Sequence, residues 1–259
     1  MVVKLENIMK NSFRQITVII VVLGTIAINI LADALPINGL NTAKISDSFH
    51  VYFVPAGYVF AIWGLIYIGL LTYAVYQALP AQRDNPRLQA TGWWVVLGGF
   101  ANSMWIFLWH YELFVGTLAV ILILLASLIA TYLSLGIGRT KVSQMETWMV
   151  RVPFSIYLGW ITVATIANVS DVLDFLKWDR FGHSAGTWML LILFAVVIIA
   201  GLVSFTHRDI AFIGVIIWAL AGIGVKFPQQ GIVTIGIWIA TVLVAATLVV
   251  AIVMKRKPA

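Results

Sequence analysis

The sequence predicts an all-α membrane protein, a polytopic helical bundle with about eight transmembrane helices. Of its 259 residues, 62% are hydrophobic and 10% are charged, whereas an average soluble domain has about 25% charged residues. Long apolar stretches recur along the chain, most of them long enough to cross the roughly 30 Å hydrocarbon core of a bilayer as a helix. The absence of cysteine excludes disulfides, thiolate metal sites and cysteine nucleophiles.

The first two spans are predicted at residues 16–35 and 55–79. The first follows a basic segment and ends in Ala-Asp-Ala, a pattern that also fits a cleaved signal peptide, but its apolar run of about 20 residues favours a span. The second opens with Pro55, which suits the first turn of a helix because it has no N–H. The polar segment between them, residues 36–54, is long for such a connection, which is typical of functional covers or disordered segments.

Six more spans follow, and the shortest of them, at about 16 residues, barely reaches across the core. Their predicted ranges are 93–109, 113–137, 148–169, 187–205, 210–225 and 232–254. His50, His110 and His183 fall in the connections and are predicted to lie in water. Asp171 and Asp174 fall in a mixed-charge loop that is predicted to be solvated.

The basic residues test this count of spans. Eight spans place twelve of the sixteen Lys and Arg residues on the side of the two termini, and leave Lys44, Lys177, Arg180 and Lys226 on the other side. The positive-inside rule then makes both termini cytoplasmic. The net charge of +6 thus reflects orientation in the membrane, here expected to be the cell inner membrane, and not nucleic-acid binding.

Polar and aromatic residues recur at helical spacing on four of the predicted spans. Thr25, Asn29 and Asp33 on the first span are predicted to make interhelical hydrogen bonds near one end of the membrane. Aromatic stripes with polar members lie on the second, third and fifth spans: Phe60, Trp63 and Tyr67; Asn102, Trp105 and Trp109; Tyr157, Trp160, Ala164 and Asn168. Lipid offers no partner to a mid-membrane Asn, so we expect these faces to point inward.

Aromatic residues can also form a belt at the membrane–water interface, without binding a ligand. We interpret the residues at predicted helix ends in this way: Trp93, Trp94, Trp148, Trp178 and Trp188. A belt does not explain Trp63, Trp105 and Trp160, which lie within spans. Residue chemistry alone leaves two explanations open for these three, namely tight packing without a ligand and a ligand pocket.

The stretch PAGYVFAIWGLIY, residues 55–67, resembles the second-helix signature of the tryptophan-rich sensory protein family, also known as TspO or the translocator protein. Trp63 and Tyr67 match the family's W-x-x-L-Y spacing, with Ile66 in place of the Leu. Asn102 and Trp105 are similar to the family's N-x-x-W in helix three.

A third motif supports the resemblance, which covers about residues 10 to 170. The family's W-x-x-x-A-x-x-L-N in helix five is similar to Trp160, Ala164 and Asn168, with Ala167 in place of the Leu. The family pattern is not followed at Gly57, Ala61 and Pro153.

The resemblance implies a five-helix bundle over residues 1–170, and the apolar runs predict three additional transmembrane helices over residues 171–259. It also implies a pocket between helices two, three and five, under the 36–54 segment, that binds tetrapyrroles, sterols and other flat apolar ligands. Sterol recognition is not expected, because the chain after helix five lacks the Tyr of the family's sterol motif. The candidate ligand-binding residues are Tyr58, Phe60, Trp63, Tyr67, Asn102, Trp105, Trp109, Tyr157, Trp160, Ala164 and Asn168.

We therefore predict a membrane receptor or carrier for porphyrin-type or other planar hydrophobic ligands, with a sensory or regulatory role. No catalytic residue, metal site or required cofactor is expected; a porphyrin or haem would be the ligand. The open alternatives are a secondary transporter of a small amphiphile, an assembly subunit of a larger membrane complex, and an enzyme that degrades tetrapyrroles by Trp chemistry, as proposed for family members. No acid, base or nucleophile inside the spans supports ordinary catalysis.

The three additional helices are expected to pack on the outside of the five-helix bundle. In lipid, such helices associate through small or polar faces. They are expected to cover the surface that shorter relatives, by the resemblance, use to form dimers, which favours a monomer or a subunit that binds a different partner.

Overall fold

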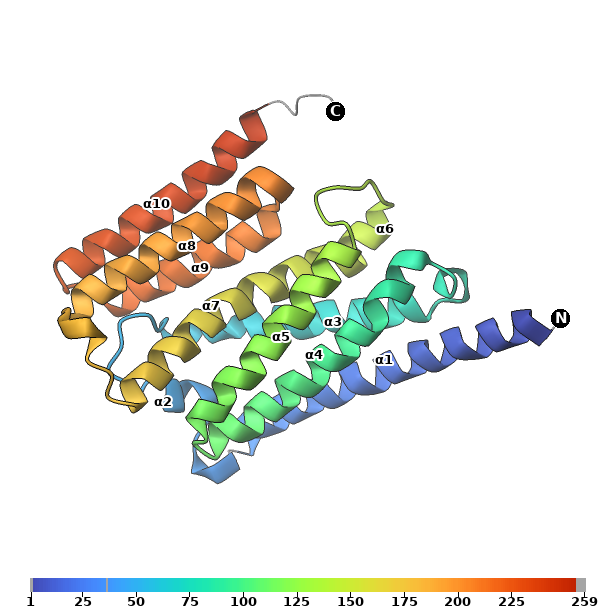
Figure 1. The fold of residues 1–259 in the computed structure, drawn as a ribbon, viewed down its shortest axis with the longest axis horizontal. Helices are drawn as coiled ribbons and strands as arrows, with labels where there is room; N and C mark the ends of the chain where they lie inside the picture. The colour runs from blue at the N-terminus through green and yellow to red at the C-terminus, as the bar shows by residue number, and fades with distance from the viewer. Residues whose placement is uncertain (1, 36, 255–259) are drawn as a thin grey trace.

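The computed structural model describes residues 2–35 and 37–254, with side chains from residue 9 onward, and this part of the chain forms a helical bundle without strands (Figure 1). Its eight long helices are α1 (Val2–Ala34), α3 (Ile62–Ala78), α4 (Pro86–His110), α5 (Phe114–Ser134), α7 (Val152–Phe175), α8 (Ala185–His207), α9 (Ile210–Lys226) and α10 (Ile232–Val253). Two short helices, α2 (Thr42–Ser46) and α6 (Gln144–Glu146), lie in the connections.

Six helical stretches within the described residues are long and apolar enough to cross a membrane. The two other long helices are α4, whose first turns are polar, and α9, which has 17 residues. At 1.5 Å per residue α9 is about 25 Å long, somewhat less than the thickness of the hydrocarbon core. The length and composition of the helices confirm the predicted helical membrane bundle.

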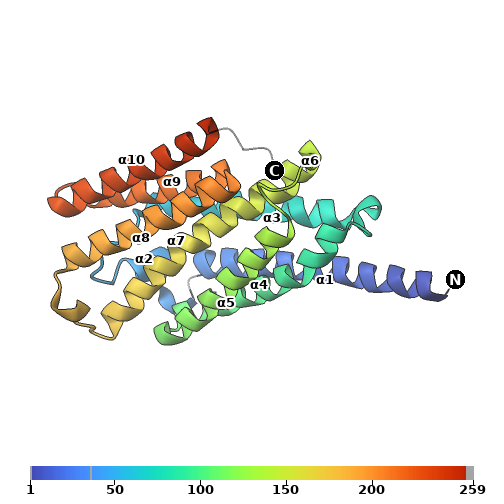
Figure 2. The ribbon, with the colours of Figure 1, turned by 45° about the horizontal axis from the view of Figure 1, so that its top comes forward.

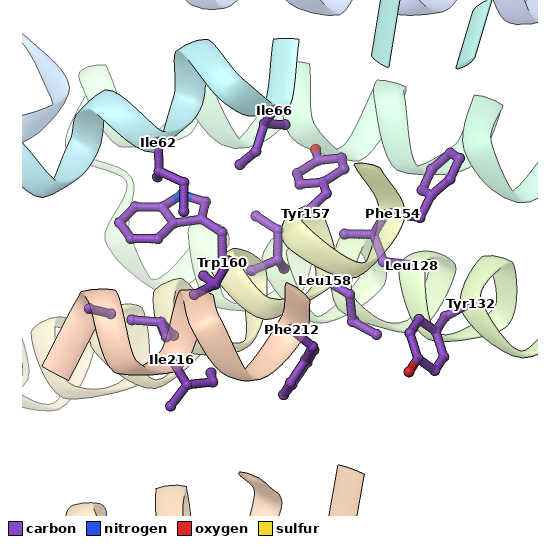
Figure 3. Close-up of a cluster of buried hydrophobic side chains, with 14 of the residues drawn as sticks. Ile62, Ile66, Leu128, Tyr132, Phe154, Tyr157, Leu158, Trp160, Phe212 and Ile216 are labelled. Carbon is purple, nitrogen blue, oxygen red and sulfur yellow. The ribbon is translucent and has the colours of Figure 1, made fainter. Parts of the chain in front are cut away.

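The helices form two groups that meet along α7. The first group contains α1, α3, α4, α5 and α7, and the second contains α8, α9 and α10 (Figures 1 and 2). Figure 3 shows Tyr157, Leu158 and Trp160 of α7 between Ile62 on α3 and Ile216 on α9. Of the second group, α9 is therefore the helix that packs against α7.

A glycine allows α9 to approach α7 closely. A Cβ added at Gly159 would lie 3.1 Å from the carbonyl oxygen of Phe212, which is tighter than most Cβ contacts, so a side chain here would require α9 to shift by a few tenths of an ångström. The added helices thus cover the α7 side of the bundle. The outer face of α4 remains exposed, with large apolar side chains at Trp93, Trp94, Leu97, Phe100, Met104 and Phe107.

The predicted start of the second span needs correction. Pro55 does not open the helix; a 3₁₀ turn, Gly57–Ala61, precedes α3. The reason is tertiary, because the Ala56 N–H donates to the carbonyl oxygen of Gly222 on α9 at 3.3 Å and holds this segment against the second group of helices. Local proline chemistry could not reveal that contact.

The start of the fifth span differs as well. A π-helical segment, Thr147–Arg151, joins α6 to α7 and ends two residues before Pro153, so helical structure begins at Gln144. Proline has no N–H to donate to the preceding turn, so the regular pattern of helical hydrogen bonds is interrupted there.

Two predictions about polar residues in connections were wrong. His110 is not in water: it is the last residue of α4, 1% exposed, and its ring contacts the Thr42 hydroxyl at 3.2 Å and the Ile37 carbonyl at 3.1 Å. Asp171 is not solvated, because α7 continues to Phe175 and buries it to 2% exposure. His50 and His183 are exposed, as predicted.

The alternating helices place their connections at two opposite ends of the bundle (Figure 1). Arg83, Arg139, Lys141 and Arg208 lie at the end where α1 begins and α10 finishes. The other basic residues of that side are Lys10, Arg14, Arg87 and Arg151, which the structure describes, and Lys255, Arg256, Lys257 and the side chain of Lys4, which fall outside the described residues.

Candidate functional site

A cavity of about 590 Å³ lies between α1, α3, α4 and α7, under the linker that contains α2. Small-molecule pockets commonly measure about 300–1,000 Å³. Its lining consists of Asn29, Ile30, Asp33 and Ala34 from α1; Asn41, Thr42 and Ala43 from the linker; Phe60, Trp63 and Tyr67; Trp105 and Ile106; and Trp160 and Ala164. Six of the eleven residues singled out by the sequence therefore meet around one space.

The walls of the cavity are mostly aromatic. Trp63 and Tyr67, one turn apart on α3, stack with ring centroids 5.6 Å apart and planes at 26°. Trp160 on α7 approaches Trp63 edge-on at 6.3 Å and Phe60 edge-on at 5.6 Å. Offset-stacked and edge-to-face pairs are the preferred arrangements of aromatic rings, and each contributes about 1 kcal/mol beyond the area it buries.

Two hydrogen-bond donors at the cavity have no partner among the described residues. They are the indole Nε1 groups of Trp105 and Trp160, both shielded from solvent. A smaller void of about 40 Å³ shares both of these residues with the cavity and extends along α7 to Asp171, whose Oδ1 also has no partner in the described structure. Buried polar groups are rarely left unpaired, so each of these atoms requires an explanation.

A polar chain crosses the bundle next to the cavity. Asn29 on α1 donates to Asn102 Oδ1 on α4 at 2.6 Å, and Asn102 donates to the Tyr157 hydroxyl on α7 at 2.9 Å. Asn102 and Tyr157 therefore connect three helices and do not line the cavity themselves. The hydrogen bonds of Asn29, together with that of Thr25 to the Gly99 carbonyl at 3.2 Å, confirm the interhelical role predicted for this stripe.

The other three candidate residues also lie outside the main cavity. Trp109 stacks on Trp105 at 4.9 Å and borders only the smaller void, and Asn168, at the same void, donates to the Thr117 hydroxyl on α5 at 2.9 Å. Tyr58 is half exposed and packs edge-on against Trp218 of α9 at 5.5 Å. Helical spacing places a residue on a face but does not give its depth along the cavity.

The linker contributes residues that the motifs did not reveal. Asn41 caps α2 by accepting from the Lys44 N–H at 2.9 Å, which positions Thr42 over the cavity. The Thr42 hydroxyl lies 3.3 Å from Asp33 and 3.2 Å from the His110 ring, so this cover is bonded to both α1 and α4. The sequence N-T-A-K, residues 41–44, could have indicated the start of this short helix, because Asn is a preferred N-cap residue.

Comparison with known proteins identifies the family. A family model described as TSPO-like protein matches residues 15–254. The chain belongs to the TSPO-like protein family. No curated protein and no solved structure matches the chain. The TSPO-like match confirms the resemblance seen in the sequence, and it extends beyond residue 170 through α8, α9 and α10.

Proposed function

We propose that this integral membrane protein is a receptor or carrier that binds planar hydrophobic ligands of the porphyrin type in the cavity, with a sensory or regulatory role. The observation that carries the proposal is the combination of aromatic faces with the unpartnered indole N–H groups of Trp105 and Trp160. Rings that stack and a few fixed donors suit a flat ligand with acceptor atoms at its edge.

The chemistry of the lining bears on the choice of porphyrin. His, Cys and Met are the side chains that most often hold haem iron, and the lining contains none of them. Asp33 is the one carboxylate among the described lining residues, and it is exposed at the end of α1. We therefore expect the ring to be held mainly by its faces and edge, so that metal-free protoporphyrin and haem bind with similar affinity.

The test is titration of the purified chain with protoporphyrin IX, followed by the absorbance and fluorescence of the porphyrin. Replacement of Trp63, Trp105 or Trp160 by Leu removes a ring contact of about 1 kcal/mol or somewhat more, so the affinity should fall roughly 5- to 10-fold. Trp105→Phe and Trp160→Phe keep an aromatic ring but remove the N–H group, which separates ring contact from hydrogen bonding.

Matched controls are available on α4. Trp93→Leu and Trp94→Leu make the same change on the outer face of the helix that carries Trp105, where both rings are exposed. These controls should bind porphyrin as the unmodified chain does. If the three cavity variants also bind with unchanged affinity while their melting temperatures fall, the rings serve only packing and the proposal is wrong.

A further inference from the structure

A second large cavity, of about 570 Å³, lies at the opposite end of the bundle from the linker. It is formed by the loop after α5, the first turns of α7 and the turn between α8 and α9, so both groups of helices contribute. Gly138 has φ +73, and a Cβ there would lie 2.1 Å from the His207 carbonyl oxygen. Any side chain at this position would therefore separate the loop from α8.

The cavity is strongly basic. Arg139, Lys141, Arg151 and Arg208 line it together with a single carboxylate, Asp209. The carboxylate is already saturated with donors. Its oxygens accept the N–H groups of Ala211 and Phe212, in the first turn of α9, at 3.0 and 3.1 Å, and the hydroxyls of Tyr132 and Ser155.

The four cations have no acidic partner among the described residues. Arg151 is 7% exposed and donates to the backbone carbonyls of Leu135 and Thr140, while its Nε has no partner in this part of the chain. The side chains of Arg139 and Lys141 are exposed and make no hydrogen bond or ion pair within the described structure. The described charges that line the cavity are thus four cations and one carboxylate, Asp209.

Membrane orientation alone does not account for this arrangement. Basic residues are expected on the cytoplasmic side of any polytopic membrane protein. Two other basic residues at the same end show that such residues can be accommodated without lining a cavity. Lys10 is exposed on α1 and lines no described cavity, and Arg87 is neutralised by a bidentate ion pair with Glu146 at 2.8 and 2.9 Å. Neither arrangement requires a cavity.

We propose that this cavity binds a phosphate group, carried either by a lipid headgroup or by a soluble molecule. Guanidinium and ammonium groups are the usual partners of phosphate oxygens, and basic pockets between membrane helices suit anionic headgroups. The apolar part of the lining, Ile137, Trp148, Val152 and Ile210, suits the less polar portion of the same molecule. A phospholipid headgroup and a soluble phosphate share the chemistry recognised here.

Native mass spectrometry of the full-length chain in a neutral detergent tests the proposal. The protein is mixed with equal amounts of phosphatidic acid and phosphatidylcholine, and bound lipid is counted by mass. We expect the phosphatidic acid adduct to dominate. The double variant Arg139→Gln/Lys141→Gln should lower its affinity at least 5-fold, because each basic group near a headgroup contributes about 1 kcal/mol.

Lys10→Gln is the matched control, since it removes one exposed charge from the same end of the bundle and should leave the adduct unchanged. Displacement of the lipid by inorganic phosphate would support the site with a soluble phosphate as its ligand, and retention of the lipid would support it with a lipid headgroup. Equal adducts with the two lipids, or equal affinity in the double variant and the unmodified chain, would overturn the proposal.

Discussion

The indole Nε1 of Trp218 on α9 donates to the carbonyl oxygen of Val59 at 3.2 Å, across 159 positions of the sequence. Val59 lies in the 3₁₀ turn that precedes α3, immediately before Phe60 of the cavity lining. The second group of helices therefore contacts the backbone of the segment that carries a cavity ring. In this chain, α9 holds in place the turn that precedes α3 and thereby stabilises one wall of the candidate site.

Gly222→Ala should disturb that support. A Cβ at Gly222 would lie 2.1 Å from Cγ2 of the fully buried Val59, so the turn or α9 must move. Overpacking of this kind typically costs about 1–3 kcal/mol. We expect a lower melting temperature in detergent and weaker porphyrin binding.

Gly214→Ala is the control for that substitution, on the same helix. Nothing lies within 4 Å of its added Cβ, and Ala is the better helix former by roughly 1 kcal/mol. Its melting temperature should stay the same or rise. Equal melting temperatures for the two variants would contradict the close contact at Gly222.

Asn102→Leu should destabilise the bundle by removing the centre of the chain from Asn29 to Tyr157. Both neighbours would be left buried without this partner, which typically costs about 1–3 kcal/mol. Ser103→Ala on the same helix is the control, because the Ser103 hydroxyl donates only to the carbonyl of Gly99 in its own helix. Thermal unfolding gives both values. The Asn29→Leu/Asn102→Leu pair should lose less than the sum of the single changes, and strict additivity would argue against coupling.

Asp33→Asn should tighten the binding of a porphyrin that carries carboxylates. Asp33 is an exposed acid in the cavity lining, and its negative charge opposes a negatively charged edge. At the effective dielectric of a protein surface the gain should be about two- to five-fold, and smaller at high salt. A porphyrin without carboxylates should show no change. Asp84→Asn, an exposed acid at the other end of the bundle, should have no effect on either ligand.

A reporter fused after Met254 should read out on the cytoplasmic side. Twelve of the sixteen basic residues lie on the side of the termini when the eight long helices alternate in direction. A second fusion in the α7–α8 connection should read out on the opposite side. An external readout after Met254 would contradict the proposed orientation.

The sequence predicted the part of the site that depends on helical periodicity. Trp63, Trp105 and Trp160 line one cavity, and each belongs to a stripe whose spacing was visible in the sequence. Periodicity identifies the face of a helix on which a residue lies. It does not show how far along the helix axis the cavity extends. Trp109 and Asn168 therefore share faces with cavity residues and still lie beyond the main cavity.

Contacts between distant segments had no local signal. His110 was assigned to water because a polar triplet follows an apolar run, yet the linker folds back and buries its ring. The basic cavity depends on Arg151 and Arg208, which are far apart in the sequence and follow no common period. Their proximity results from the docking of α9 on α7, which sequence patterns do not specify.

The anchoring of the linker has a consequence for the kinetics of ligand exchange. His50 N–H bonds to Asp174 on α7 at 3.0 Å, Asp47 pairs with Lys226 on α9, and Thr42 contacts His110 on α4. Lifting the linker would require all three contacts to break. The exposed lining residues, Ile30, Asp33 and Ala34, all belong to α1. We therefore expect ligands to enter sideways from the bilayer, past the end of α1, with association rates that depend on lipid composition and not on the salt that weakens the linker's ion pair.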